Sequence, residues 1–417
     1  DDAPAGAAQA RVNAKNANRF CHIRTLYETM RDNSHAVDNP LRKVLIIGGY
    51  GRFGARLVRL LARESALELI IAGRSGQKAE RLAAEPAAAR LTPLTFDRTR
   101  DPHGQIARLA PHMVVDAAGP FQHYGAEPYA VAEGALKARA HYFDLADDPG
   151  FVTGIARLNT EALAAGRAAL SGASSVPALS FAAARTLLPA FSSVDGYTGG
   201  ISPAPSASVG LSLIKAITSY AGKSIGVIRD GRPAFAPGLI DSLTHQIGFE
   251  GVVPLSPRRF SLVDVPDLLL AREVFPGLKT LWFGAAPQPE FGHTALSAAA
   301  QLVSAKLLPS LVPFSRVIEP LANRLTWGEA RGGMFLRLTG LDHMGKRADL
   351  SWNLIAEDDA GPNIPAMAAA ALIKRCLAGN PPEPGARPAH EALELADFEP
   401  FFANLAIRHG VVVHEKI

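Results

Sequence analysis

Glycines occupy positions 49, 51 and 54, and this Gly-x-Gly-x-x-Gly spacing is typical of a dinucleotide-binding loop. An apolar run at 44–47 precedes them and predicts a strand buried on both faces of a parallel sheet. We expect Gly49 to permit the sharp turn after this strand and Gly51 to let a pyrophosphate approach the main chain. Gly54 would let the following helix pack closely on the strand. The alternative interpretation is a glycine-rich turn that binds nothing.

The helix after the loop is expected to begin near Arg52 and Phe53. The free N–H groups of its first turn, at the positive end of the helix dipole, would face the phosphates. The second strand, at 69–72, leads into Arg74 and Ser75 and lacks the terminal acid that usually accepts hydrogen bonds from the ribose of NAD. A cation and a hydroxyl suit a 2′-phosphate instead. We therefore predict NADP(H) as the coenzyme, with NAD(H) less favoured; the alternative for Arg74 is a solvated surface charge.

The order of the elements predicts an α/β fold. Strands and helices alternate from 41 to about 180, which indicates a Rossmann-type, doubly wound parallel sheet. Predicted strands lie at 44–47, 69–72, 91–96, 113–115, 142–145 and 168–171. Predicted helices begin near 52 and lie at 77–90, with a kink or early stop expected at Pro86, and at 106–109, 128–138 and 152–165. Asp97, at the end of the third strand, is included among the expected coenzyme-binding residues.

The pattern changes after about 180 and predicts a second, α+β domain. Its elements are a linking helix at 181–188, β-like runs at 194–201 and 209–213, and a hairpin of 334–338 with 348–356. An Ala-rich helix follows at 364–378. We predict a poorly ordered extension at 1–40 with one short helix at 20–31, a dinucleotide-binding domain at 41–180 with a return helix at about 360–380, a substrate and dimerisation domain at 181–359, and a C-terminal segment at 381–417.

Composition excludes several classes of protein. Of 417 residues, 48% are hydrophobic and 20% charged, which is typical of a folded globular chain. The net charge of +4, without a Lys/Arg run, argues against nucleic-acid binding. Two cysteines, Cys21 and Cys376, cannot form a disulfide framework, so we expect a cytoplasmic protein. Neither a transmembrane stretch, a signal-peptide core nor a metal-binding His/Cys spacing is visible, and Met30 is a candidate translation start.

Three motifs together resemble one family. The glycine loop is followed by Ala-Gly-Arg-Ser at 72–75, by Gly-Pro-Phe-x-x-Tyr-Gly at 119–125 and by His-Tyr-Phe-Asp-Leu at 141–145. Over 41–180 the chain resembles the NADP-binding domain of the saccharopine dehydrogenase/reductase family. Residues 361–386 resemble the return segment of this superfamily, whereas 190–330 resembles bacterial members other than the lysine-pathway enzymes, so no substrate residue is carried over. The resemblance implies an NADP-dependent oxidoreductase with a small-molecule substrate.

In such folds the loop after the fourth strand passes beside the coenzyme, at the carboxyl edge of the sheet. Gly119 would allow close approach of the main chain, and Ala118 is included with it. Pro120 would stiffen the turn, and Phe121 would pack on the nicotinamide side. This loop is therefore expected to contribute to the coenzyme site.

Candidate catalytic residues follow this loop and the fifth strand. His123 and Tyr124 would be the nearest groups able to donate a proton to the heteroatom that becomes charged when a hydride adds to C=N or C=O. The alternatives are a surface histidine and a buried tyrosine with a satisfied hydroxyl. Asp144, with Asp147 and Asp148, closes the fifth strand, where carboxylates would bind an amine or hold a base. Capping of the next helix is the favoured interpretation for Asp147 and Asp148, and Asp144 suits site and scaffold equally.

Three functions are consistent with these patterns. The favoured one is a saccharopine dehydrogenase-type oxidoreductase that transfers hydride to or from an imine, amino acid or carbonyl substrate. The second is an NADP-dependent reductase of an apolar acyl or enoyl substrate, and the third is a non-catalytic NADP(H)-binding module. An apolar stretch at 294–314 predicts a buried or dimer-facing helix, with an apolar channel or membrane-surface contact as the alternative. The hairpin of the second domain is also compatible with a homodimer.

Overall fold

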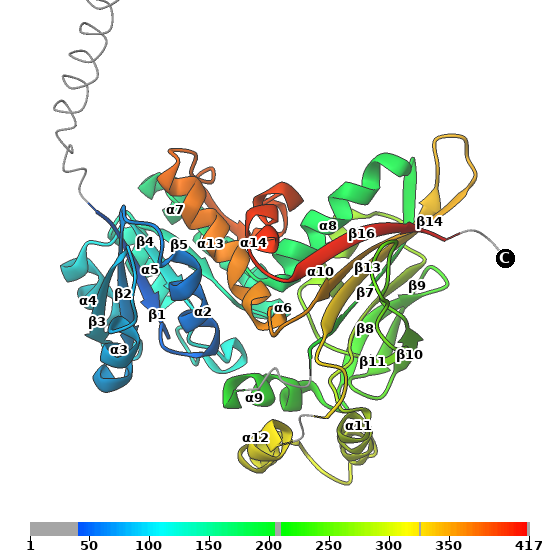
Figure 1. Ribbon diagram of the computed structural model, residues 1–417. Coiled ribbons are helices and arrows are strands. Elements are labelled where there is room, and N and C mark those ends of the chain that lie inside the picture. Colours follow the sequence, from blue (N-terminus) through cyan, green and yellow to red (C-terminus); the bar gives the residue numbers. More distant parts are fainter. Residues whose placement is uncertain (1–40, 205–209, 325–326, 415–417) are drawn as a thin grey trace, which may run out of the picture. The chain divides into compact units, whose positions relative to one another are not determined.

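The computed structural model describes residues 41–204, 210–324 and 327–414 (Figure 1). The extension predicted at 1–40, with its short helix, lies outside the described residues. None of the helices in the described ranges combines the length and the apolar character needed to cross a membrane.

Seven parallel strands form the first sheet, in the order β15-β6-β5-β4-β1-β2-β3. They are β1 (Arg42–Ile47), β2 (Leu67–Gly73), β3 (Arg90–Thr95), β4 (Met113–Asp116), β5 (His141–Asp144), β6 (Ala168–Ser171) and β15 (Gly385–Pro388). The strand order reverses at β1, since β2 and β4 flank it on opposite sides. Such a reversal is where open α/β sheets bind ligands, at the carboxyl ends of the strands. The predicted Rossmann-type sheet is confirmed.

Helices cover both faces of this sheet because alternate residues of β1 point to opposite sides. Val44 and Ile46 belong to the apolar cluster of one face, and Leu45 and Ile47 to that of the other. The first face is covered by α2 (Arg52–Leu61), α3 (Gly76–Ala83) and α13 (Ile364–Leu377). The second is covered by α4 (Pro102–Leu109), α5 (Ala130–Lys137), α6 (Pro149–Gly154) and α7 (Asn159–Ala165).

The second sheet is mixed, in the order β10-β11-β12-β7-β13-β14-β16, with β8 and β9 joined at β12. Its strands are β7 (Ser193–Ser202), β8 (Ser224–Arg229), β9 (Arg232–Pro237), β10 (Ser242–His245), β11 (Arg258–Leu262), β12 (Thr280–Ala285), β13 (Gly332–Leu341), β14 (Arg347–Ala356) and β16 (Ile407–Val413). The associated helices are α8 (Ser180–Leu187), α9 (Leu211–Tyr220), α10 (Asp267–Val274), α11 (Glu290–Ser304), α12 (Ser315–Arg324) and α14 (Glu399–Ala403). One apolar cluster runs from β1 through α13 and α8 to β13, so the two sheets share a core.

Three predicted elements differ in extent or type. The helix predicted at 77–90, with a kink or early stop at Pro86, ends at Ala83. The helix predicted at 152–165 is broken by a 3-10 segment at Ile155–Leu158. Of the β-like run predicted at 209–213, position 209 lies outside the described residues, and 211–213 instead open α9, because a short apolar run does not separate strand from helix.

The apolar stretch at 294–314 is not a single buried helix. Its helix, α11, ends at Ser304, and Lys306 adopts a left-handed φ of 61°. Val303 is buried, whereas Leu302 and Leu307 are 47% and 76% exposed. The prediction of burial is therefore correct for one side of the stretch only.

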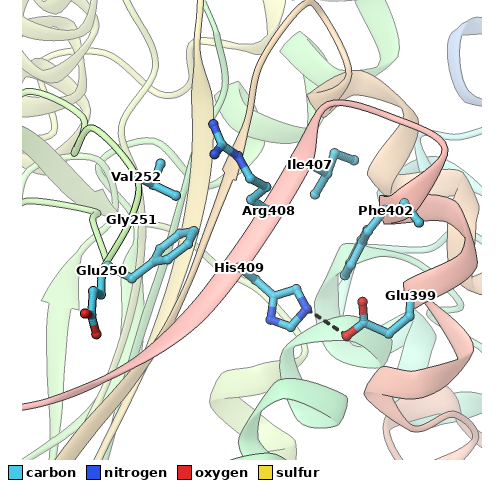
Figure 2. A pocket seen from close by; sticks show the side chains of 10 residues that line it. Glu250, Gly251, Val252, Glu399, Phe402, Ile407, Arg408 and His409 are labelled. Carbon is cyan, nitrogen blue, oxygen red and sulfur yellow. Dashed lines mark hydrogen bonds and ion pairs between the residues drawn. The ribbon is translucent and has the colours of Figure 1, made fainter.

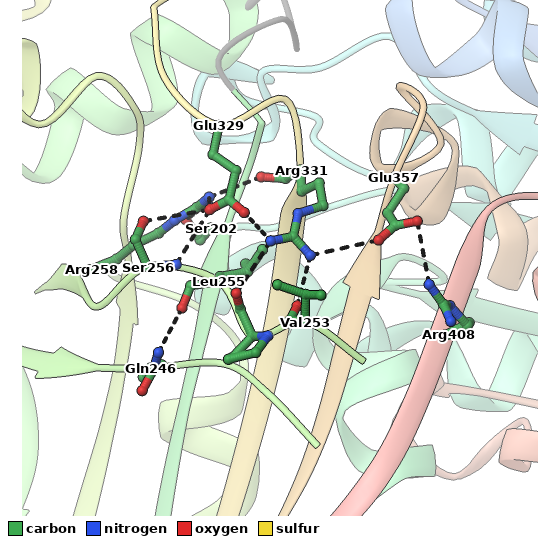
Figure 3. A network of polar contacts seen from close by, with 11 residues as sticks. Ser202, Gln246, Val253, Leu255, Ser256, Arg258, Glu329, Arg331, Glu357 and Arg408 are labelled. Carbon is green, nitrogen blue, oxygen red and sulfur yellow. Dashed lines mark hydrogen bonds and ion pairs between the residues drawn. The ribbon is translucent and has the colours of Figure 1, made fainter. Parts of the chain in front are cut away.

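A chain of alternating charges fastens one end of the second sheet (Figure 3). Arg258, whose side chain is 2% exposed, donates to Glu329 over 3.2 Å. Glu329 also pairs with Arg331, which reaches Glu357 at 3.6 Å, and Glu357 pairs with Arg408 at 3.4 Å. These ion pairs tie β11, the segment before β13, β14 and β16 together. They also compensate the positive charge of the buried Arg258 guanidinium.

Candidate functional site

The glycine loop turns over Gly48, Gly49 and Tyr50. Gly48 has a left-handed φ of 75°, and a Cβ there would lie 2.8 Å from the carbonyl oxygen of Ala117 on the neighbouring loop. The amide of Gly51 donates to the carbonyl of Gly48 over 2.7 Å and closes the turn. Gly49 is a central residue of this turn, and a Cβ there would lie 2.8 Å from the carbonyl oxygen of Ile46. The turn predicted at Gly49 therefore includes that residue and also requires Gly48, which sequence reasoning missed although the adjacent glycine pair was a signal.

The start of α2 has no side-chain cap. Gly51 is the N-cap and supplies no side-chain acceptor, and the first turn holds no acid. The helix begins directly after the turn, at Arg52 as predicted, so the positive end of its dipole lies at the glycine loop. Gly54 is required for this packing, since a Cβ there would lie 2.2 Å from the carbonyl oxygen of Gly48. The loop fits a pyrophosphate because bare main chain and an uncapped helix start meet at one point.

Positive charge surrounds this helix start. Burial is the main cause that lowers the pKa values of Arg52 and Arg56, and Arg56 lowers that of Arg52 further. Arg52 also lies beside the start of α9, because a Cβ at Gly210 would be 3.7 Å from its Nε. The second sheet's helices therefore reach the glycine loop.

An aromatic ring covers the end of β2, where the ribose contact of this fold is expected. A Cβ at Gly73 would lie 2.5 Å from the ring of Tyr50, so glycine is needed there. The Tyr50 hydroxyl accepts the amide of Ser75 over 2.8 Å. Ser75 caps α3 by accepting from Lys78, and the side chain of Arg74 is exposed. Sequence reasoning missed Tyr50, although an aromatic residue between loop glycines was a signal.

Asp97 shapes its own turn. Its carboxylate accepts the amide of Thr99 over 3.0 Å and the hydroxyl over 2.7 Å. These bonds are the main cause that lowers the pKa of Asp97, and Arg74 and Arg100 contribute through charge. Asp97 thus lies near Arg74, at the edge predicted for the coenzyme, with a local structural contact of its own.

The loop after β4 contacts the second sheet's helix α9. Gly119 precedes a cis Pro120, and the Ser212 hydroxyl donates to the Gly119 carbonyl over 3.2 Å. The Ala118 amide donates to Asp116 over 3.0 Å. Phe121 is buried, with its ring centroid 4.8 Å from that of Tyr124. This loop is therefore braced from both sides at the carboxyl edge of the first sheet.

Asp116 and Asp144 end neighbouring strands in register, and both are fully buried. Asp116 Oδ1 accepts the Tyr124 hydroxyl over 3.0 Å, and the Arg98 guanidinium carbon lies 3.4 Å from the centroid of the Tyr124 ring. Asp144 Oδ1 accepts from the Ser171 hydroxyl at 3.0 Å, the Gly172 amide at 2.8 Å and the Ala146 amide at 3.0 Å. The Oδ2 atoms of both aspartates are buried without a hydrogen-bond partner among the described residues.

Burial dominates the electrostatics of these groups. It raises the pKa of Asp116 and brings that of Asp144 to about 7, and the charge of Asp116 adds to the latter shift. It also raises the pKa of Tyr124 well above its usual value, with a further contribution from Asp116. The pair of carboxyl groups therefore holds a proton near neutral pH. Asp116 was missed by sequence reasoning, although it ends its strand as Asp144 does.

The three predicted catalytic residues are only partly brought together. Tyr124 and Asp144 join one buried group through Asp116, whereas the side chain of His123 is exposed. Asp148 caps α6 by accepting the Phe151 amide over 2.7 Å, which confirms its predicted capping. The capping predicted for Asp147 is wrong.

Asp147 instead belongs to a polar group built from both sheets. It accepts a hydrogen bond from Gln122 over 3.2 Å. Burial is the main cause that raises the pKa of Tyr220 on α9, and the charge of Asp147 raises it further. Asp264, which follows β11, also acts on Tyr220, and burial raises the pKa of Asp264 itself to about 6. Carboxyl groups of this kind bind amines or exchange protons. Tyr220 and Asp264 had no motif in the sequence, because only folding brings them to Asp147.

One pocket of about 390 Å³ opens beside the loop that follows β4. Its walls include Phe121, Tyr124, Tyr129 and Phe151, and the guanidinium carbon of Arg157 lies 4.2 Å from the centroid of the Tyr129 ring. The pocket therefore combines aromatic walls with one cation.

A second pocket, of about 380 Å³, lies between residues 249–252 and α14 with β16 (Figure 2). His409 has both ring nitrogens engaged there. The Trp352 indole donates to Nδ1 over 3.1 Å, so Nε2 carries the proton and donates to Glu399 over 2.7 Å. No ring nitrogen remains for a substrate, and the arrangement is structural. Within the ranges that the structure describes, no three His, Cys, Asp or Glu side chains are placed to hold a metal ion.

Residues 44–172 match the family model described as the saccharopine dehydrogenase NADP binding domain. Over these residues the chain is similar to that domain family. The match begins within β1 and ends just after β6, so the matched region includes the glycine loop, the loop after β4 and both buried aspartates. No curated protein matches the sequence of the chain.

Comparison with solved structures finds matches at low sequence identity. Apo saccharopine dehydrogenase (L-Glu forming) from Saccharomyces cerevisiae is 12% identical with a TM-score of 0.61, over 89% of this chain and all of that one. A probable dehydrogenase from Thermotoga maritima is 11% identical with a TM-score of 0.42, over 89% of this chain and 98% of that one. The yeast structure thus shows that both sheets of the present chain occur together in a known fold.

Proposed function

We propose that this protein is an NADP-dependent oxidoreductase of saccharopine dehydrogenase type, which transfers hydride to or from an imine, amino acid or carbonyl substrate. The observation that carries the proposal is the uncapped start of α2 at the glycine loop, in a domain of the saccharopine dehydrogenase NADP-binding family. The fold shared with the yeast saccharopine dehydrogenase agrees with it. A homodimer and a cytoplasmic location stay predictions.

The preference for NADP(H) over NAD(H) rests on the end of β2. Gly73 and the exposed Arg74 stand where an NAD site usually has an acid, and Ser75 adds a hydroxyl. Replacement Arg74→Ala is expected to weaken NADPH binding about tenfold or more and to leave NADH binding nearly unchanged, since a 2′-phosphate loses its cation. Calorimetric titration of both coenzymes measures this difference. Lys78→Ala, which removes an exposed cation from α3, is the matched control. Equal losses for the two coenzymes would contradict the assignment.

The chain's own groups supply the proton and the substrate contacts. NADP(H), when bound, supplies or accepts the hydride. We propose that Tyr124 donates the proton, that the Asp116–Asp144 pair holds a proton behind it, and that exposed His123 exchanges protons with solvent. The hydrogen bond between Tyr124 and Asp116 supports this pathway, because a protonated Asp116 would return a proton to the Tyr124 oxygen after Tyr124 has given its own to the substrate. Asp147, with Asp264 and Tyr220, would bind the amino group of a substrate, and their carboxyl groups support a nitrogen-bearing substrate.

Reduction of an apolar acyl or enoyl substrate is the second candidate. It is favoured by exposed apolar side chains on α11 and α12, because α12 packs on α9 and α9 contacts the Gly119 loop. Loss of NADPH absorbance with a panel of amines plus 2-oxo acids, set against acyl and enoyl thioesters, separates the two. If NADPH binds but no compound in either group of the panel is turned over, catalysis on these substrates is refuted and the non-catalytic module is favoured.

A further inference from the structure

The segment that carries α11 and α12 exposes many large hydrophobic side chains. Seven of the fifteen that are exposed among the described residues lie between 291 and 327. We call them the α11–α12 surface: Phe291, Leu302, Leu307, Phe314, Val317, Leu321 and Trp327. Leu307 and Trp327 are 76% and 72% exposed. The Phe291 and Trp327 ring centroids are 6.4 Å apart, so the start of α11 lies beside the segment after α12. Exposed apolar side chains that lie together are typical of an interaction surface.

The apolar residues of α12 form a stripe that faces solvent. Phe314, Val317, Leu321 and Arg324 are spaced by three or four residues, so they share one side of the helix, and all are exposed. The opposite side faces the protein, where the Ser315 hydroxyl lies 3.0 Å from that of Thr218 on α9. A helix that turns its apolar stripe outward has a partner outside the fold.

The charges around this surface are mostly positive. Lys306, Arg316 and Arg324 are exposed, whereas Glu319 is half-buried and its charge acts inward on Arg52 of the glycine loop. Glu290, at the start of α11, is the exposed acid of the two helices. Leu, Phe and Trp side chains beside Lys and Arg are typical of helices that lie in the interface of an anionic membrane.

A second copy of this chain is the competing partner. In a two-fold symmetric dimer the same patch meets itself, so Arg316 and Arg324 would face the like charges of the other copy. An anionic bilayer has the opposite charge and covers apolar side chains without that repulsion. The charge pattern therefore selects the lipid surface.

We propose that the α11–α12 surface binds the surface of an anionic lipid bilayer, with the apolar side chains in the interface and the basic side chains on the headgroups. Both helices border α9, since α12 contacts Thr218 and a Cβ at Gly222, just after α9, would lie 2.2 Å from the Ala300 carbonyl of α11. Because α9 in turn contacts the Gly119 loop, α12 and α9 would lie between that loop and the membrane when the protein is bound. This inference does not depend on the coenzyme.

Vesicle binding by the full chain tests the proposal. Trp327 is a built-in reporter, because the other two tryptophans, Trp282 and Trp352, are buried. Vesicles of phosphatidylcholine with a quarter phosphatidylglycerol are expected to pellet the protein and to shift its emission to shorter wavelength. Vesicles of phosphatidylcholine alone are expected to bind about tenfold or more weakly. Brominated lipids should quench the emission, and Trp327→Phe should abolish the shift while the protein still pellets.

Two variants and a control separate surface binding from unfolding. Val317→Glu with Leu321→Glu, and separately Arg316→Glu with Arg324→Glu, are each expected to weaken binding to anionic vesicles about tenfold or more. Phe235→Glu, at a side chain 78% exposed on β9, should leave binding unchanged. The proposal is overturned if no vesicle binds, if the β9 control loses binding equally, or if sedimentation velocity shows a dimer that the Val317/Leu321 variant dissociates.

Discussion

Replacement of Asp144 by asparagine tests whether the buried aspartate pair carries a proton in the folded protein. An asparagine oxygen keeps the three hydrogen bonds that Oδ1 accepts from Ser171, Gly172 and Ala146. The amide nitrogen takes the place of Oδ2, next to the strand of Asp116. The variant therefore imitates the protonated acid and removes the titration.

Burial raises the pKa of Asp144 from 3.8 to about 7, so the folded protein binds this proton more tightly than the unfolded chain does. The resulting stability is fully present below about pH 4 and is lost as the pH rises through 7, at about 1.4 kcal/mol per pH unit. The whole loss amounts to about 4 kcal/mol. Asp144→Asn does not undergo this loss, so it should be more stable than the parent protein at pH 8.

Urea unfolding at a series of pH values between about 4 and 8 measures the effect. The parent protein should lose unfolding free energy over this range more steeply than the variant. Glu383→Gln, at an exposed carboxylate, should follow the parent. If Asp144→Asn lowers stability by a constant amount and its pH profile runs parallel to the parent's, Asp144 is ionised in the fold and the reasoning is wrong.

Three further substitutions test the coenzyme loop and the charge chain. Gly51→Val should abolish NADPH binding in a calorimetric titration, because its side chain fills the space for the phosphates and its Cβ would lie 2.8 Å from the Gly48 carbonyl oxygen of the same loop, whereas unchanged affinity would place the site elsewhere. Glu329→Gln should lower the unfolding free energy by about 1–3 kcal/mol in urea titrations, because the buried Arg258 loses its countercharge. Glu357→Gln, at the outer part of the chain, should cost less than about 1 kcal/mol, and an equal or larger cost would contradict this order.

The first sheet could be predicted from sequence because its strands are buried on both faces. Four consecutive apolar residues in β1, followed by the glycine loop and the amphipathic α2, leave little choice of local structure. The hairpin of β13 and β14 was visible for a similar reason, since its turn at 342–346 lies between two apolar runs.

The rest depends on contacts between distant residues. The Gly48 turn is decided by the approach of Ala117, and the helix α9 by its packing against α12. Asp116 has the same local sequence signal as Asp144, but its contact with Tyr124 exists only in the fold. Asp147 and Asp264 both act on Tyr220 but follow strands of different sheets, so no spacing in the sequence could reveal this group.

The strands β15 and β16 give the chain a particular order of assembly. β15 pairs with β6, at one edge of the first sheet, and β16 pairs with β14, at one edge of the second. During synthesis on the ribosome, β6 and β14 emerge well before these partners, and each presents an open row of amides and carbonyls until residues 385–413 leave the exit tunnel. The nascent protein therefore passes through a stage in which two strand edges are unpaired and prone to aggregation. Chaperones, or the pairing of β15 and β16 once they emerge, would protect these edges.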